Sequence, residues 1–384
     1  MKNKVLAIHY HSIVGLKNNR LTTDFFTGMW VESLSKNFSK IFVIAFTDRN
    51  NYSFEYISSN IQLIDLGKKP TKLKDFYLKL PKYYKILKKY NSCFDYLGIR
   101  MPTPLGICIS FIFRSTPKFF LIIGSMPDVV KCSDTSITKK IILYVFWKID
   151  QILYRFFKDD TLFLGNNKNY KKTFPYIKNM KIIPTSTINK NDIINKPRSL
   201  NQNFLRLIFI GRIDDEKGLN YLIEAISMLQ KQKVNLNLKI VGVKKDGKKR
   251  MLENFINKYG VEHIIELIPF TTKRKDIFNY LDNSDLLIIP SIWDSQPRVA
   301  WEAMARGLPV LASKGVQSLQ DESLGILKFK SKSSQSIYNT ILHLISSKNK
   351  YTELSKGSLQ LVKSKTLEKS AEMFLKELNL ETNK

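Results

Sequence analysis

Cysteine is scarce in this 384-residue chain, which holds three, none of them in a CxxC pair. That spacing argues against a disulfide framework or a structural zinc site and favours a reducing cytoplasm. Long apolar runs are also missing, because the longest, residues 105–113, is about half of the roughly 20 residues that a membrane-spanning helix needs. The apolar N-terminal stretch VLAIHY is interrupted by His9 and His11, which predicts a buried first strand rather than a signal peptide.

Acidic residues are few: 33 Asp and Glu stand against 62 Lys and Arg, giving a net charge of +29. The excess is greater in residues 1–200 (33 basic, 13 acidic) than in residues 201–384 (29 basic, 20 acidic). Such a charge attracts nucleic acid, anionic lipid or phosphorylated small molecules, although a lysine-rich composition is an equally good explanation of the total. No RNA-binding, zinc-finger or helix-turn-helix pattern occurs, so no nucleic-acid partner is expected.

Short β-branched or aromatic runs alternate with helical patterns, such as the apolar spacing from Phe26 to Phe38. This alternation predicts parallel sheets covered on both faces, and its occurrence in two sets predicts an α/β fold of two Rossmann-like, doubly wound domains facing across a cleft. The predicted strands are Val5–Tyr10, Ile41–Phe46, Ile61–Leu66, Tyr96–Arg100, Phe119–Ile123, Leu162–Leu164, Ile182–Pro184, Leu207–Ile210, Leu238–Val241, Ile264–Ile268, Leu286–Pro290 and Val310–Ser313.

The stretch 185–203 is polar and contains a proline, as is typical of a linker. We therefore expect an N-terminal domain over residues 1–195 and a C-terminal domain over residues 196–384, whose last helix can pack back on the first domain. Ligands of doubly wound sheets bind beyond the carboxyl ends of the strands, so the site is expected in the cleft between the domains.

The loop after strand 207–210 carries two cations. Gly211 permits a tight exit from the strand, and Arg212 and Lys217 are expected to project into the cleft. Arginine can grip a phosphate with two hydrogen bonds while lysine acts as a point charge, so the pair suits a diphosphate leaving group. The alternative is a solvated loop in which Lys217 pairs with Asp214 or Asp215.

The loop after strand 286–290 leads into a predicted helix over residues 298–306, with Gly307 placed to terminate it. Backbone N–H groups at the start of a helix can bind phosphate or sugar oxygens. Glu302, one turn into the helix, can accept both hydroxyls of a ribose, and Asp294 precedes the helix and can meet the sugar. The backbone N–H groups around Gln296 to Val299 are expected to be unpaired, and the residues expected to contact the ligand here are Gln296, Pro297 and Val299.

Residues 207–313 resemble the C-terminal half of the family 4 glycosyltransferases, which are retaining, nucleotide-sugar-dependent enzymes of GT-B architecture. The resemblance lies in the G-R-x(4)-K-G loop from Gly211 and in the acidic-x(7)-acidic motif that ends E-A-M-A-x-G-x-P-V. It implies that Arg212 and Lys217 hold the donor diphosphate, that Glu302 binds the ribose and that Asp294 contacts the donor sugar. The family usually has Glu in place of Asp294, so this contact is expected to be shifted or mediated by water.

The first half resembles the family more loosely. Gly28 stands where the family often has a Gly-Gly turn near the donor phosphates, and it is expected to contact the donor. The family frequently carries a His near the reacting carbon, but the segments after strands 96–100 and 119–123, including Ser125–Asp128, have none, so no catalytic base is assigned. His9 and His11 either contact substrate or are structural, and His263 and His343 are expected to be structural.

The function implied by the resemblance is retaining transfer from a UDP- or GDP-sugar to a glycan or lipid-linked acceptor in bacterial O-antigen or capsule assembly. We expect no metal and no cofactor besides the nucleotide-sugar donor, because no Asp-x-Asp motif follows a strand. Two basic, aromatic stretches, 72–90 and 139–157, could lie in a membrane interface. We assign that role to the first and sheet packing to the second, and expect a cytoplasmic protein peripheral to the inner face of the plasma membrane.

Two rival functions remain open. The chain could be a catalytically inactive glycosyltransferase-like subunit, because Asp294 replaces Glu and the family His is not found. It could also be a membrane-surface binding protein. Retention of Arg212, Lys217 and Glu302 together argues against the inactive subunit.

Overall fold

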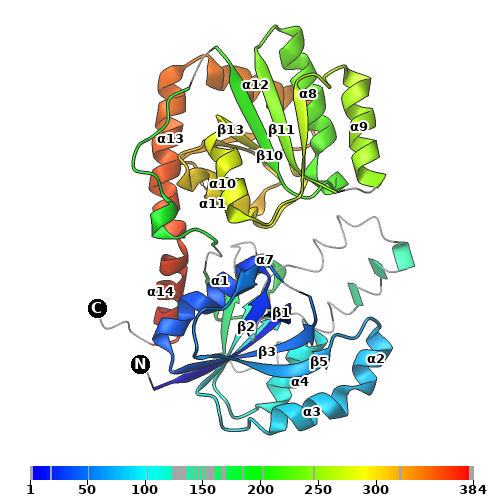
Figure 1. The fold of residues 1–384 in the computed structure, drawn as a ribbon, viewed down its shortest axis with the longest axis vertical. Coiled ribbons are helices and arrows are strands. Elements are labelled where there is room, and N and C mark those ends of the chain that lie inside the picture. The colour runs from blue at the N-terminus through cyan, green and yellow to red at the C-terminus, as the bar shows by residue number, and fades with distance from the viewer. Residues whose placement is uncertain are drawn as a thin grey trace. The chain divides into compact units, whose positions relative to one another are not determined.

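The structure, a computed structural model, describes residues 3–379 apart from 18–19, 51, 102, 123–135, 166–169, 184–185, 201–202, 245–246, 320–321 and most of 139–160. The segment Ser125–Asp128 therefore lies outside the described residues. The chain divides into two compact units, the first formed by Met1–Pro184 with Glu368–Lys384 and the second by Thr185–Leu367. Each unit is built on a sheet of its own (Figure 1).

The first unit is built on one sheet, to which the described residues contribute nine strands. Its parallel strands run in the order β5-β3-β1-β6-β7-β8-β9, while β2 and β4 add an antiparallel edge through the far end of β1. The strands are β1 (Val5–Lys17), β2 (Arg20–Thr23), β3 (Lys40–Asp48), β4 (Phe54–Glu55), β5 (Ile61–Lys68), β6 (Tyr96–Met101), β7 (Lys118–Ile122), β8 (Leu162–Gly165) and β9 (Met180–Ile182).

Helices cover both faces of this sheet. The helices formed by the described residues of the unit are α1 (Phe25–Leu34), α2 (Leu73–Leu78), α3 (Leu80–Lys88), α4 (Pro104–Ile112), α7 (Tyr170–Thr173) and α14 (Leu367–Glu377). Leu87 of α3 and Ile109 of α4 share one core with Ile99 of β6. On the other face, Phe374 of α14 packs against Trp30 of α1, with 5.4 Å between ring centroids. The C-terminal helix thus completes the core of the first unit.

The second unit has a parallel sheet in the order β12-β11-β10-β13-β14-β15. Counted along the chain this is the order 3-2-1-4-5-6 of doubly wound nucleotide-binding sheets. Its elements are β10 (Leu205–Ile210), β11 (Leu236–Val243), β12 (Ile265–Pro269), β13 (Leu286–Ile289), β14 (Val310–Ser313), β15 (Ile326–Phe329), α8 (Leu219–Lys231), α9 (Gly247–Tyr259), α10 (Arg274–Asp282), α11 (Arg298–Ala305), α12 (Ser334–Ile345) and α13 (Lys348–Val362).

Alternate residues of each strand enter two different cores. In β10, Leu207 and Phe209 pack with α8, α9 and α12, whereas Ile208 packs with α10 and α11 on the opposite face (Figure 1). Because successive side chains of a strand point to opposite faces, a central strand covered on both sides must be apolar throughout. The run LRLIFI meets this requirement at all but one position, which explains why such runs predict the strands well.

The predicted α/β class with Rossmann-like units is confirmed, and the predicted strands are all present, most of them with shifted ends. The largest difference is in β1, which continues to Lys17 instead of ending at Tyr10, and β9 occupies Met180–Ile182 instead of Ile182–Pro184. Three strands were not predicted: β2, β4 and β15. They are two to four residues long, too short to show a period.

The boundary between units also differs from the predicted 195/196, since it falls at Pro184. The polar stretch that follows is not a free linker. Ile188 is fully buried in a core of the second unit, and the Ile194 N–H donates to the Ala305 carbonyl at 2.9 Å. Buried contacts therefore attach the segment to the second unit, a property that low average hydrophobicity does not reveal.

Hydrophobic helices are short in the described part of the chain. None of the helices there combines the length and the apolar character that crossing a bilayer requires.

Candidate functional site

The two motif loops lie together at the carboxyl edge of the second sheet. They follow β10 and β13, which are neighbouring parallel strands paired at Leu207 and Leu286. The Ile292 N–H of the second loop donates to the Glu216 carbonyl of the first at 2.7 Å. This is also where the strand order reverses direction, the point at which doubly wound sheets bind their ligands.

Two glycines allow the close approach of backbone that this edge requires. Gly218 has a φ of +65°, and a Cβ there would lie 2.3 Å from the Pro290 carbonyl oxygen. Gly242, at the end of β11, has a φ of +124°, and a Cβ there would lie 1.9 Å from the Gly211 carbonyl oxygen. Both the backbone conformation and the space therefore require glycine. The sequence motif contains Gly218, but nothing in the sequence singled out Gly242.

Lys217 and Asp294 form an ion pair between the loops, with 2.7 Å from Nζ to Oδ2. Their side chains are only 13% and 15% exposed. Asp294 is held further by its other carboxylate oxygen, which accepts the Gln296 N–H at 3.2 Å. The alternative pairing of Lys217 with Asp214 or Asp215 is not found, and the nearest other carboxylate is that of Glu216 at 3.7 Å.

Arg212 occupies a more open position, with 64% of its side chain exposed. Its guanidinium contacts Asp214 at 2.7 Å and Glu216 at 2.9 Å. Asp214 also accepts a hydrogen bond from Lys248 of α9. Burial by itself raises the pKa of Asp214, but the Lys248 hydrogen bond and the nearby cations Arg212 and Lys217 outweigh it and hold that pKa below its ordinary value.

Helix α11 begins where predicted. Pro297 is its N-cap, no side chain caps its first turn, and Gly307 follows its end with a φ of +65°. The first-turn N–H groups of a helix have no partner within the helix, and Val299 stands in this turn. The Gln296 N–H was expected to have no hydrogen-bond partner, but it donates to the Asp294 carboxylate.

Glu302 is half-buried on α11, and one of its carboxylate oxygens accepts a hydrogen bond from the Thr187 hydroxyl at 2.8 Å. Thr187 is itself buried, and its carbonyl accepts a hydrogen bond from Arg274. Thr187 was missed by the sequence reasoning, because it lies in the polar stretch interpreted as a linker, 115 residues from Glu302.

Gly28 is not in a turn. It lies within α1, and a Cβ there would lie 2.1 Å from the Phe54 ring, so its lack of a side chain makes room for that ring. The start of α1 is capped by Asp24, whose carboxylate accepts the Thr27 N–H at 3.0 Å and a hydrogen bond from Ser12. The structure thus gives Gly28 a packing role, and contact with the donor stays a prediction.

The histidines take different positions. His9 lies within β1, where the register shifts, and is 2% exposed on the wall of a pocket in the first unit. His11 also belongs to β1, but its side chain lies outside the described residues. His263 and His343 are at the surface of the second unit, beside Gln230 and Lys350 respectively.

No group of three or more His, Cys, Asp or Glu side chains is arranged to hold a metal ion in the ranges that the structure describes. The ion pairs at the site involve Arg212, Asp214, Glu216, Lys217, Lys248 and Asp294.

The second unit is similar in sequence to known glycosyltransferases. Residues 190–360 match the family model described as glycosyl transferases group 1. An uncharacterized glycosyltransferase of Haemophilus influenzae is 31% identical over 137 residues, which cover 35% of this chain and 37% of that protein. The amylovoran biosynthesis glycosyltransferase AmsK of Erwinia amylovora is 30% identical over 116 residues, covering 29% and 28%. These alignments span about a third of the length of the curated relatives.

Solved structures resemble the chain over nearly its whole length. Sucrose-phosphate synthase from Thermosynechococcus elongatus has a TM-score of 0.73 at 16% identity, covering 98% of both chains. HepE of Anabaena, in complex with UDP and glucose, has a TM-score of 0.69 at 16% identity, covering 98% of this chain and 100% of that one. The chain therefore has the GT-B glycosyltransferase fold, and residues 190–360 match the group 1 glycosyl transferases.

Proposed function

We propose that this protein is a retaining, metal-independent glycosyltransferase. It moves a sugar from a nucleoside-diphosphate sugar to a glycan or lipid-linked acceptor in bacterial surface-polysaccharide assembly. The observation that carries the proposal is the meeting of the two motif loops in one ion pair, Lys217 with Asp294, at the switch point of the second sheet. Glu302 lies on the helix that follows, in the position that the resemblance assigns to the ribose contact.

The transfer reaction mainly requires stabilisation of the leaving group. As the bond to the anomeric carbon breaks, negative charge develops on the departing diphosphate, and Lys217, Arg212 and the first-turn N–H groups of α11 are donors suited to it. Fixed donors of this kind are most effective where water is excluded, which favours the half-buried Lys217 over the exposed Arg212. The acceptor hydroxyl attacks from the same face, and its proton passes to the leaving phosphate.

The donor nucleotide is expected to be UDP or GDP. UDP is the first to test, because the HepE structure that shares this fold contains UDP and glucose. A role in polysaccharide assembly is supported by AmsK, which is named for amylovoran biosynthesis. O-antigen and capsule are the two assembly contexts that we propose for this chain.

An anionic membrane surface is the proposed docking partner of helices α2 and α3 in the first unit. Residues 72–89 contain seven lysines and one aspartate. Leu78 is 69% exposed, and Tyr77 and Tyr84 are each about half exposed among these lysines. Exposed aromatic and aliphatic groups within a basic surface fit the boundary between lipid headgroups and acyl chains. This supports a cytoplasmic protein that is peripheral at the inner face of the plasma membrane.

The second basic, aromatic stretch, residues 139–157, is more exposed than predicted at the positions that the structure describes. Ile141, Tyr144, Val145 and Ile152 are each about half exposed, so these residues do not pack on the sheet as expected. Their exposure adds apolar surface to the first unit, which favours the same membrane role.

The experiment that tests the function is a thermal-shift screen of the full chain against UDP, GDP, CDP, ADP and their common sugar conjugates, with and without EDTA. A ligand that binds only the native state raises the melting temperature with its occupancy. We expect one nucleoside diphosphate to raise it in a manner insensitive to EDTA. No shift with any nucleotide, in protein shown to be folded, would favour the inactive subunit, and a shift abolished by EDTA would contradict metal independence.

The retaining outcome and the membrane role have separate readouts. The anomeric configuration of the product, followed by NMR during transfer, is expected to equal that of the donor, and inversion would overturn this part of the proposal. Co-sedimentation with vesicles containing anionic lipid is expected to exceed that with neutral vesicles and to fall in the Leu78→Ser variant. Equal sedimentation with both vesicle types would remove the membrane from the proposal.

A further inference from the structure

Thr187, whose hydroxyl donates to Glu302, lies in a buried segment outside regular secondary structure. Residues 186–189 belong to neither a helix nor a strand, yet Ser186, Thr187 and Ile188 are all buried. Buried backbone groups need hydrogen-bond partners, because an unpaired buried group costs free energy. The partners of this segment therefore show what holds the Thr187 hydroxyl in place.

Arg274, the first residue of α10, binds the segment at two points. One terminal nitrogen of its guanidinium donates to the Thr187 carbonyl, and the other donates to the Asp192 carboxylate. Both side chains of the Arg274–Asp192 ion pair are mostly buried. The planar fork of an arginine fixes two acceptors in one geometry, which the single ammonium group of a lysine cannot do. Arg274 therefore holds Thr187 and Asp192 in a fixed relation to α10.

Arg274 is itself held against an aromatic ring. Its Cζ lies 4.5 Å from the ring centroid of Phe278, one turn further along α10. Arg306 lies over the same ring, with 5.5 Å from Cζ to the centroid, and donates to the Asp192 carbonyl at 3.0 Å. Cation–π contacts of this kind stabilise a guanidinium at a defined position. Two arginines beside one ring thus bind Asp192 at its carboxylate and at its carbonyl.

The backbone on the other side of Thr187 is also fixed. The Ile188 carbonyl accepts the Leu367 N–H at 2.7 Å, and the Ile188 N–H donates to the Ser186 hydroxyl at 3.0 Å. The side chain of Ile188 is fully buried in a core of the second unit. Thr187 is therefore flanked by buried backbone whose hydrogen bonds are satisfied, and its side chain extends from a fixed position.

The Thr187 hydroxyl in turn orients the Glu302 carboxylate. It donates to Oε1 at 2.8 Å, and no second hydrogen bond to this carboxylate comes from the residues that the structure describes. An ionised carboxylate offers about four acceptor positions, so room is left for two more hydroxyls. The 2′ and 3′ hydroxyls of a ribose are two such donors on adjacent carbons.

We infer that Arg274 and Thr187 are positioning residues that fix the Glu302 carboxylate for both hydroxyls of a ribose, so that the donor is a ribonucleotide and a 2′-deoxyribonucleotide is rejected. The inference rests on the proposed transferase function, in which Glu302 receives the ribose. A carboxylate that is free to turn can pair with water when one hydroxyl is missing. A fixed, half-buried carboxylate is left without a partner instead, and this loss is what makes hydrogen-bonded sites selective.

The test compares UDP with 2′-deoxy-UDP, and GDP with 2′-deoxy-GDP, by titration calorimetry on the full chain. The quantity of interest is the ratio of the two affinities within a pair, because a general loss of structure weakens both ligands alike. Thr187→Val removes the hydroxyl, Thr187→Ser retains it, and Arg274→Lys keeps the charge without the fork. Arg206→Lys is the matched control, since Arg206 binds the Asp285 carboxylate with two nitrogens near the start of β10.

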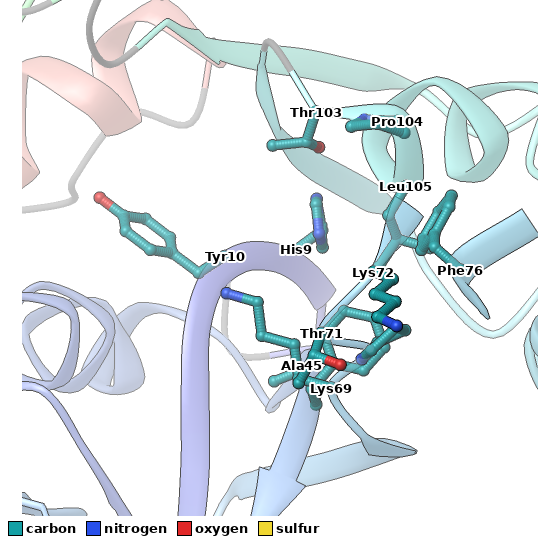
Figure 2. Close-up of a pocket in the computed structure, with 12 residues that line it drawn as sticks. His9, Tyr10, Ala45, Lys69, Thr71, Lys72, Phe76, Thr103, Pro104 and Leu105 are labelled. Atoms are coloured by element: carbon teal, nitrogen blue, oxygen red, sulfur yellow. The ribbon is translucent and has the colours of Figure 1, made fainter. Parts of the chain in front are cut away.

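Nucleotide binding in this test reports on the second unit. Figure 2 shows a pocket of the first unit, in which the ring of His9 faces a space lined by Phe76 and Thr103. Its volume is about 180 Å³, whereas sites that enclose a drug-sized ligand measure roughly 300–1,000 Å³. A nucleoside diphosphate is too large for this pocket. Inorganic diphosphate, titrated in parallel, measures the phosphate contacts alone.

We expect the wild type to bind one ribonucleotide at least about tenfold more tightly than its 2′-deoxy form, the effect of one hydrogen bond to a charged group. Thr187→Val and Arg274→Lys should each lower this ratio at least about threefold and leave diphosphate binding unchanged. Thr187→Ser and Arg206→Lys should keep the wild-type ratio. Thr187→Val, which is nearly isosteric, carries the comparison if Arg274→Lys does not fold.

Three results would overturn the inference. Equal affinity of the wild type for both members of each pair would contradict a ribonucleotide donor. An unchanged ratio in Thr187→Val or Arg274→Lys would remove that residue from the positioning of Glu302, and an equal fall of the ratio in Arg206→Lys would show a general effect of destabilisation. Failure of both UDP and GDP to bind contradicts the transferase proposal itself, whereas binding without discrimination contradicts only this inference.

Discussion

Lys217 and Asp294 are 77 residues apart in the chain, and their side chains meet at 2.7 Å in a half-buried ion pair. The pair joins the loop after β10 to the loop after β13. A diphosphate that binds Lys217 must therefore share the ammonium group with the Asp294 carboxylate or displace it. Asp294 thus influences donor affinity as well as the sugar contact that the resemblance assigns to it.

Replacement of the two cations should weaken nucleotide binding to different extents. Lys217→Ala is expected to lower the affinity for UDP more than tenfold, as a hydrogen bond to a charged group contributes about 1.5–3 kcal/mol. Arg212→Ala should lower it less, because the Arg212 side chain is largely exposed. Titration calorimetry measures both, with Lys249→Ala, a surface lysine paired with Glu253, as the control. Wild-type affinity in the Lys217 variant would remove this residue from the site.

Neutralising Asp294 should separate binding from transfer. Asp294→Asn removes the carboxylate that competes for Lys217, so the affinity for UDP is expected to equal or exceed that of the wild type. Transfer from the sugar nucleotide is expected to fall at least about tenfold, the loss associated with one oriented polar contact at the reacting group. UDP binding and initial transfer rates measure the two effects. A lower UDP affinity in this variant would contradict competition within the ion pair.

Glu302 should distinguish a nucleoside diphosphate from inorganic diphosphate. Glu302→Ala is expected to weaken UDP binding and to leave diphosphate binding almost unchanged, because only UDP carries a ribose. Thr187→Val removes the hydroxyl that donates to Glu302 and should produce a smaller loss in the same direction, about 0.5–1.5 kcal/mol. Calorimetric titration with both ligands checks this. Equal losses for UDP and diphosphate would mean that Glu302 does not hold the ribose.

Gly218 should be intolerant of a side chain. Gly218→Ala places a Cβ 2.3 Å from the Pro290 carbonyl oxygen in a backbone conformation that favours glycine, and we expect it to destabilise the second unit by about 1–3 kcal/mol. Gly247→Ala is the matched control, because nothing lies within 4 Å of a Cβ there and alanine favours the helix it begins. Urea unfolding of the two variants compares them. Equal midpoints would show that the loop can move away from Pro290.

The carboxylate of Asp214 should contribute stability in a defined pH range. Its pKa is lower in the folded state than the ordinary value of about 3.9, so the unfolded chain binds more protons there than the folded chain. The stabilisation is therefore complete above that ordinary value and is lost as the pH falls through the folded pKa. The difference in unfolding free energy between wild type and Asp214→Asn is expected to shrink below about pH 4. A constant difference from pH 6 to pH 3 would contradict this linkage.

Most of the secondary structure could be predicted because the strands of a doubly wound sheet are buried on both faces. Their apolar runs are then visible locally, as in Leu286–Ile289. The antiparallel edge formed by β2 and β4 was missed because these strands are only four and two residues long, and because β1 was predicted to end at Tyr10, before the residues with which β2 pairs. Thr187 was missed for a different reason, since a hydroxyl in a polar segment shows its importance only through the carboxylate that it contacts.

The amino-acid order by itself determined two α/β units and the motif loops around Lys217 and Glu302, because strand burial, helix capping and glycine turns are local properties of the chain. Only the tertiary structure decided that Lys217 pairs with Asp294, that Thr187 orients Glu302 and that Phe54 fills the space above Gly28. These contacts depend on which strands become neighbours. The order of the strands depends on hydrogen bonding and packing between segments that are distant in the chain. The energies of these interactions cannot be read from a local pattern of residues.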